Sequence, residues 1–175
     1  MNLPNVLSIL RLCLTAFFIV SVTYQRYTEA LVLFVAQAVS DLLDGFLARI
    51  LHKKTDLGAW LDPIADKVML VSSYLVLGFQ EIVPYWVVAI VLSRDLVVAG
   101  GFLFLHLFSS RVVPSPSLLG KATTVLQMVT VLYLLWSVTR EFQLYFFYAV
   151  AGLTLLSGFQ YLLLGLTALS RKEIV

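Results

Sequence analysis

The chain has 175 residues, of which 61% are hydrophobic and 13% charged, and its formal net charge is only +2. Soluble domains have roughly 45–50% apolar residues, so this composition excludes an ordinary soluble domain and indicates an integral membrane protein. The small net charge gives no support to nucleic-acid binding, and a single cysteine, Cys13, excludes an intramolecular disulfide.

Six apolar segments follow one another along the chain, each near the ~20 residues that a helix needs to cross a bilayer. They lie at about 5–24, 29–51, 59–79, 84–108, 117–139 and 142–168. None of them alternates with a period of two residues, which favours helices over the strands of a barrel. The connections are short, and no composition shift marks a second domain. We therefore predict an all-α fold with six transmembrane helices in a single domain over residues 1–175.

Basic residues at the ends of the segments and in their connections are distributed unevenly between the two sides of the membrane. One side carries Arg49, Lys53, Lys54, Arg111, Lys121, Arg171 and Lys172. The opposite side carries Arg26 and Arg140. Cytoplasmic loops are enriched in lysine and arginine, so this pattern predicts that both termini lie in the cytoplasm.

Four aspartates lie at helical spacing where the second segment ends and the third begins. Asp41 and Asp44 are three residues apart, and Asp62 and Asp66 are four apart, so each pair shares one helix face. Carboxylates at membrane depth are costly, and they are rare unless they serve a site. The short connection predicts antiparallel neighbouring helices, which would bring all four together. Oxygen ligands without histidine or cysteine favour Mg²⁺ or Mn²⁺ over zinc.

Small residues and an arginine accompany the acidic pairs. Gly45 and Ala48 permit close approach to the backbone, Arg49 offers a fork suited to a phosphate, and Gly58 suits a tight turn or close packing. This combination indicates a diphosphate held by metal and arginine beside a carboxylate that takes a proton. Two metal ions suit such an in-line displacement.

Simpler interpretations of the same residues stay open. Asp41 is a candidate helix cap, and Asp62, which precedes Pro63, is a candidate helix N-cap. Gly45 and Ala48 are also ordinary helix-packing residues, and Arg49 also fits an interfacial anchor. A small cation channel or transporter, or a scaffold with an inactive site, are interpretations from other functional classes. The combined spacing, with its phosphate-binding arginine, favours an enzyme over both.

The motif Asp41-x2-Asp44-Gly45-x2-Ala48-Arg49-x8-Gly58-x3-Asp62-x3-Asp66 resembles the signature of the CDP-alcohol phosphatidyltransferases. The resemblance extends over nearly the whole chain and implies a six-helix membrane core, a homodimer and a two-metal site made by the four aspartates. It also implies that Asp66 is the catalytic base. The acceptor hydroxyl would then attack the β-phosphorus of CDP-diacylglycerol and expel CMP. By the same resemblance, the residues that contact the CDP-lipid are Asn5, Gly45, Ala48, Arg49, Thr55 and Gly58.

Two further stretches resemble the branch that makes phosphatidylglycerophosphate and cardiolipin. These are Leu61-Asp62-Pro63-Ile64-Ala65-Asp66-Lys67 and the opening Asn2-Leu3-Pro4-Asn5-Val6-Leu7-Ser8-Ile9-Leu10-Arg11. A phosphate-bearing acceptor needs positive groups near the metals. The candidates for binding it are Lys67, Arg94, Arg111 and Lys121. Simpler interpretations are neutralisation of Arg94 by Asp95, a snorkelling Lys121 and a loop charge at Arg111.

The chain departs from the expected pattern of the phosphatidylglycerophosphate synthases at two places. It has Ser93-Arg94-Asp95 where they have Ser-Arg-Glu, and Gly120-Lys121-Ala122-Thr123-Thr124 lacks their second lysine. The Ser-Arg-Asp form is similar to the cardiolipin synthases of the same family. We nevertheless expect glycerol 3-phosphate as the acceptor, because within this family it is the commoner activity of a compact chain of the bacterial type, which we expect in an inner or cell membrane. Phosphatidylglycerol is the alternative. Inositol phosphate, serine and choline-type acceptors fit the pattern less well.

Overall fold

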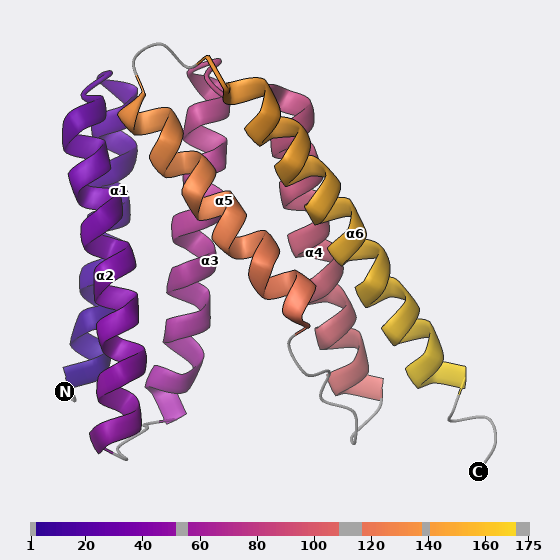
Figure 1. Cartoon of the computed structure of the whole chain (residues 1–175). Helices are drawn as coiled ribbons and strands as arrows, with labels where there is room; N and C mark the ends of the chain where they lie inside the picture. Colours follow the sequence, from indigo (N-terminus) through magenta and orange to yellow (C-terminus); the bar gives the residue numbers. More distant parts are fainter. Residues whose placement is uncertain (1–2, 52–55, 109–116, 138–140, 171–175) are drawn as a thin grey trace. The chain divides into compact units, whose positions relative to one another are not determined.

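The computed structural model describes residues 3–51, 56–108, 117–137 and 141–170, and the side chains of 9–41, 67–101, 117–137 and 141–164. Within these ranges the chain forms six helices and no strand (Figure 1). The helices are α1 Leu3–Thr23, α2 Tyr27–Leu51, α3 Asp56–Phe79, α4 Tyr85–Phe108, α5 Leu118–Trp136 and α6 Gln143–Ser170. Each overlaps one of the six predicted apolar segments over most of its length, which confirms the all-α prediction.

The composition of the helices fits a membrane environment. Within the described residues, Leu118–Trp136 and Gln143–Leu164 are long and apolar enough to cross a bilayer. Large apolar side chains such as Phe17, Leu96 and Leu156 are more than half exposed. Extended apolar surface of this kind indicates contact with lipid. The six-span topology and the orientation of the termini stay predictions.

The chain divides into two compact units. The first contains Met1–Val83 and Val131–Arg140, and therefore holds α1, α2, α3 and the end of α5. The second contains Pro84–Thr130 and Glu141–Val175, and holds α4, most of α5, and α6. A single domain over residues 1–175 stays a prediction.

In the first unit, α1 packs against both α2 and α3 (Figure 1). Its buried face is formed by Arg11, Thr15, Phe18 and Val22, which recur at helical spacing. The Phe18 ring meets the ring of Phe34 on α2 with their centroids 5.8 Å apart. This face of α1 changes from apolar to polar toward the N-terminus of the helix.

A tight turn joins α1 to α2, and a hydrogen bond joins the end of α3 to the end of α1. After α1, the N–H of Arg26 donates to the carbonyl of Ser21 at 2.8 Å, and Gln25 adopts a φ of 59°. This pairing, with a left-handed residue after the last turn, is a Schellman motif. The amide of Gln80 at the end of α3 donates to the carbonyl of Thr23 at 3.4 Å. The turn and this hydrogen bond therefore hold the three helices together at the end of the unit away from the acidic motif.

In the second unit, α4 packs against α6, and hydrogen bonds join α5 to α6 along a polar stripe. Thr123 donates to the carbonyl of Leu153 at 3.3 Å, and the amide of Gln127 donates to the hydroxyl of Thr154 at 3.2 Å. Thr123, Gln127 and Thr154 are fully buried. Each buried polar group along this contact must find a partner, so the stripe specifies how α5 registers against α6.

Candidate active site

The acidic motif lies at one end of the first unit, on two helices that both pack against α1. Asp41, Asp44, Gly45, Ala48 and Arg49 belong to α2, and Gly58, Asp62 and Asp66 belong to α3. Four residues connect Leu51 to Asp56, so the two helix ends lie within about 18 Å of each other. Thr55 and Arg111 lie outside the described residues. The side chains of Asn5, Asp44, Gly45, Ala48, Arg49, Gly58, Asp62 and Asp66 also lie outside them.

The helical register relates the motif to the buried faces of α2 and α3. On α2, buried Ala30, Phe34 and Gln37 are followed at the same spacing by Asp41. On α3, Met69 and Leu70 are the first buried residues among the side chains that the structure describes, and helical spacing puts positions 62 and 66 on the same helix face as Leu70. Asp41 therefore continues the stripe of α2 that forms part of the core of the unit.

An ion pair joins α1 to the first aspartate of the motif. The Nη1 atom of Arg11 lies 3.2 Å from Oδ1 of Asp41. The side chain of Arg11 is 0% exposed and that of Asp41 is 37% exposed. A buried arginine needs a carboxylate or several hydrogen bonds to compensate for its lost hydration. The position of Asp41 is therefore set partly by α1, an element outside the motif.

The next turn of the same two helices carries a second polar contact. The hydroxyl of Thr15 lies 2.8 Å from Oε1 of Gln37 and 2.9 Å from the carbonyl oxygen of Arg11. Gln37 and Thr15 are both buried. Thr15 follows Arg11 by four residues and Gln37 precedes Asp41 by four, so the two contacts are successive rungs between antiparallel helices. They fix the register of α1 against α2 beside the motif.

Sequence reasoning did not assign a role to Arg11. The signal was present, since an arginine lies inside an otherwise apolar run, with a threonine one turn later on the same face. An arginine at such a position implies a buried carboxylate partner. The sequence does not show which helix packs beside α1 at this position. The structure shows that the partner is Asp41 on α2.

The donor set of the motif fits hard divalent cations. Its members offer carboxylate oxygens only, the ligands that Mg²⁺ and Mn²⁺ prefer. Among the described side chains, no three histidine, cysteine, aspartate or glutamate residues come together, and Asp41 is the one motif aspartate with a described side chain. A carboxylate has two oxygens and about four lone-pair positions, so the pair with Arg11 leaves acceptor positions for an ion.

A second polar cluster lies in the other unit and is centred on Arg94 of α4. Its Nη1 lies 2.7 Å from Oδ1 of Asp95, and its Nη2 donates to the hydroxyl of Ser157 on α6 at 3.2 Å. The guanidinium carbon lies 5.7 Å from the centre of the Tyr161 ring. The side chains of Arg94 and Asp95 are 7% and 8% exposed. Arg94 and Asp95 therefore form a buried ion pair, as the simpler interpretation of the sequence anticipated.

The four predicted acceptor-binding residues fall in different parts of the chain. Lys67 is exposed near the middle of α3, in the first unit. Lys121 is exposed in the first turn of α5, in the second unit, where Arg94 is buried. Arg94 and Lys121 thus belong to one compact unit.

Comparison with known proteins identifies the family. The family model described as CDP-alcohol phosphatidyltransferase matches residues 1–159. The CDP-diacylglycerol--glycerol-3-phosphate 3-phosphatidyltransferase of Escherichia coli (strain K12) is 36% identical over 171 residues, which cover 92% of this chain and 93% of that protein. Proteins of the same name from Shigella sonnei (strain Ss046) and Shigella flexneri serotype 5b (strain 8401) show the same identity and coverage. The chain is a membrane protein that belongs to the CDP-alcohol phosphatidyltransferase family.

Proposed function

We propose that the protein transfers the phosphatidyl group of CDP-diacylglycerol to glycerol 3-phosphate, forming phosphatidylglycerophosphate and releasing CMP. The observation that carries this proposal is the complete acidic motif in a chain 36% identical to the Escherichia coli enzyme, whose name states that reaction. Phosphatidylglycerol is the second candidate acceptor. It is favoured by Asp95 after Ser93-Arg94 and by the absence of a second lysine after Lys121.

Asp41, Asp44, Asp62 and Asp66 are the residues that hold divalent cations in this proposal. When bound, two such ions neutralise the diphosphate and stabilise charge on the attacking and leaving oxygens. Asp66 accepts the proton of the acceptor hydroxyl. The acceptor oxygen then forms a bond to the β-phosphorus, and the bond from that phosphorus to the bridging oxygen of CMP breaks. The electron pair of the broken bond leaves with CMP.

The groups that hold the CDP-lipid in the proposal lie mainly on the motif helices. Arg49 pairs with the diphosphate, and Gly45, Ala48 and Gly58 provide close approach to the helix backbones. Asn5 on α1 and Thr55 complete the set around the nucleotide and its phosphates. Because α1 carries Asn5 and packs against both motif helices, it is well placed to align the CDP-lipid with the aspartates.

Positive groups bind the phosphate of the acceptor in the proposal. Arg94 is the principal one, because burial strengthens each hydrogen bond that its fixed guanidinium makes. Lys121 is the second, since it lies in the same unit, and Lys67 and Arg111 add positive charge. We further propose six membrane spans, both termini in the cytoplasm and a homodimer. These follow from the distribution of basic residues and from the family.

Removal of divalent cations tests the metal-dependent part of the proposal. CMP release from CDP-diacylglycerol in the presence of glycerol 3-phosphate is expected to fall to background after chelation. It is expected to return with Mg²⁺ or Mn²⁺, because carboxylate oxygens are the ligands these ions prefer. The measurement is steady-state CMP release before chelation, after it, and after each ion is restored. Activity that persists through exhaustive chelation would remove the metal-binding role from the four aspartates.

A further inference from the structure

We propose that Tyr161 is a positioning residue for the acceptor, which acts by holding the guanidinium of Arg94 beside the first turn of α5, and that Gly120 is required for this fit. The inference rests on the proposed role of Arg94 in binding the acceptor phosphate. All the residues that carry it belong to the second unit and have described side chains.

Tyr161 completes the set of groups that surround Arg94. The arginine has an ion pair with Asp95 on its own helix and a hydrogen bond to Ser157 on α6. Tyr161 is one turn further along α6 and presents its ring to the guanidinium, 5.7 Å from the ring centre. The guanidinium is thus held by a carboxylate, a hydroxyl and the face of an aromatic ring, which come from two helices. Together these groups strongly favour one orientation of the guanidinium.

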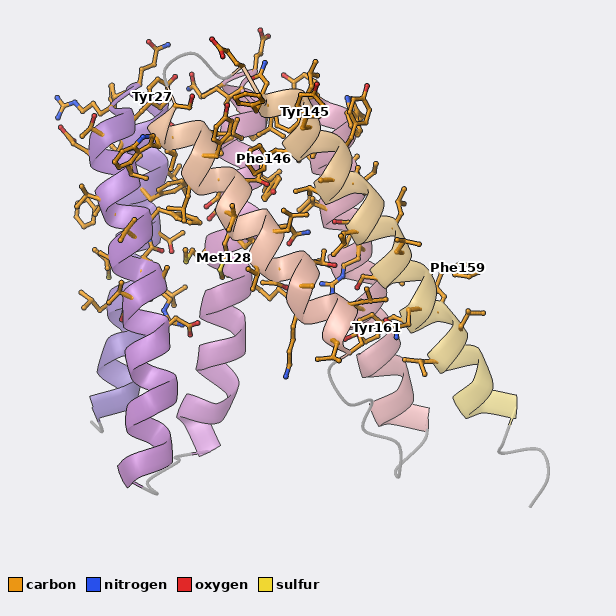
Figure 2. The ribbon with its side chains drawn as sticks, viewed as in Figure 1. Tyr27, Met128, Tyr145, Phe146, Phe159 and Tyr161 are labelled. Carbon is orange, nitrogen blue, oxygen red and sulfur yellow. The ribbon has the colours of Figure 1, made fainter. Side chains whose placement is uncertain are left out.

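Tyr161 is itself held by the beginning of α5. The backbone N–H of Ser117 donates to the Tyr161 hydroxyl at 3.3 Å. The Ser117 hydroxyl accepts the N–H of Gly120 at 3.0 Å, which makes Ser117 the N-cap of α5. The side chain of Tyr161 turns from α6 toward this end of α5, whereas nearby Phe159 points away from the bundle (Figure 2). The ring that orients Arg94 is therefore fixed by a capped helix end.

The space at Gly120 shows how closely these groups meet. A Cβ atom on Gly120 would lie 3.0 Å from the Tyr161 hydroxyl, 3.1 Å from Oγ of Ser117 and 3.2 Å from Nη2 of Arg94. Such contacts are closer than ordinary van der Waals packing. A methyl group here would have to displace the tyrosine, the arginine or the helix cap. Glycine is thus needed for close approach, although its φ is not positive.

The same distances place the guanidinium of Arg94 where nearby positive charge would stabilise a bound anion. Nη2 of Arg94 lies against the first turn of α5, whose end carries partial positive charge, and Lys121 follows Gly120 directly. Nη2 has two hydrogens, and its bond to Ser157 uses one of them. Tyr161 therefore holds a charged hydrogen-bond donor beside the first turn of α5 and Lys121, both of which attract a phosphate group.

Four single variants of the full chain test the inference. Tyr161→Leu removes the ring and the hydroxyl, Tyr161→Phe removes the hydroxyl alone, and Gly120→Ala crowds the cluster. Gly158→Ala is the matched control, because its added Cβ would meet Arg94 only at an ordinary 3.6 Å. CMP release is measured with CDP-diacylglycerol and glycerol 3-phosphate varied separately, and thermal unfolding is recorded for every variant.

We expect Tyr161→Leu and Gly120→Ala to raise the KM for glycerol 3-phosphate by about tenfold, as loss of a cation–π contact and a misdirected charged donor predict. The KM for CDP-diacylglycerol and kcat should stay within about twofold. Tyr161→Phe should fall between Tyr161→Leu and the unchanged protein, and Gly158→Ala should match the unchanged protein. A purely structural role would change both KM values together or lower kcat, and that result would overturn the inference.

Arg94→Gln separates failure of the inference from failure of the proposed function. If this variant raises the KM for glycerol 3-phosphate while the Tyr161 and Gly120 variants do not, Arg94 binds the acceptor and Tyr161 has no positioning role. If Arg94→Gln leaves that KM unchanged, the acceptor role of Arg94 is wrong, and the inference that depends on it is overturned as well.

Discussion

Asp66→Asn is expected to lower kcat by about a thousandfold, because general-base catalysis contributes 10²- to 10⁴-fold and the amide of asparagine cannot accept the acceptor proton. Asparagine keeps the size of the side chain and one oxygen ligand. Binding of CDP-diacylglycerol should therefore stay within a few-fold of its original affinity. The measurement pairs the rate of CMP release with calorimetric titration of CDP-diacylglycerol in the presence of Mg²⁺.

Glu29→Gln is the matched control for this substitution. It also converts a carboxylate to an amide, but at the opposite end of α2, where Glu29 is 56% exposed and lies 3.4 Å from Arg26. Exposed ion pairs contribute about 0–1 kcal/mol, so this variant should retain its activity and stability. If Asp66→Asn is as active as Glu29→Gln, Asp66 is not the base.

Arg11→Met is expected to destabilise the protein by about 2–3 kcal/mol, less than the 3–5 kcal/mol typical of a fully buried broken pair. The lower figure reflects the 37% exposure of Asp41, which water partly solvates once its partner is removed. CMP release should fall as well, because Asp41 loses the group that orients it. The measurements are reversible unfolding in detergent and the rate of CMP release.

Two variants distinguish the effect of the Arg11–Asp41 pair on stability and activity from the effect of general packing between α1 and α2. Thr15→Val removes the neighbouring contact with Gln37 and keeps the volume, so it should cost about 1 kcal/mol and retain activity. Arg11→Met combined with Asp41→Asn should be less destabilised than the sum of the two single variants, since no unpaired charge remains. Full additivity in this double-mutant cycle would show that Arg11 and Asp41 do not interact.

The helices could be predicted from the sequence because the chain is organised by one dominant signal. Apolar runs of membrane-spanning length predicted all six segments, and the short breaks between them include Gln25 and Glu81. The helix boundaries differ by a few residues. The predicted fifth segment reached 139, whereas α5 ends at Trp136, because hydropathy does not record where the last backbone turn closes.

Contacts between helices could not be predicted in the same way. The spacing of the aspartates showed which of them share a helix face, but not that Arg11 of α1 is the partner of Asp41. Tyr161 carries no local signal at all, since an aromatic residue near the end of an apolar helix is usually an interfacial anchor. Its contacts with Arg94 and Ser117 depend on how α4, α5 and α6 meet, which is a property of packing.

We propose that this family member uses glycerol 3-phosphate as its acceptor. The most direct measurement supplies the purified protein with CDP-diacylglycerol and Mg²⁺, together with glycerol 3-phosphate, phosphatidylglycerol or no acceptor, and identifies the lipid product by mass spectrometry. The proposal predicts CMP release and phosphatidylglycerophosphate with glycerol 3-phosphate, and background release in the other two reactions. Cardiolipin formed from phosphatidylglycerol, with no product from glycerol 3-phosphate, would contradict it.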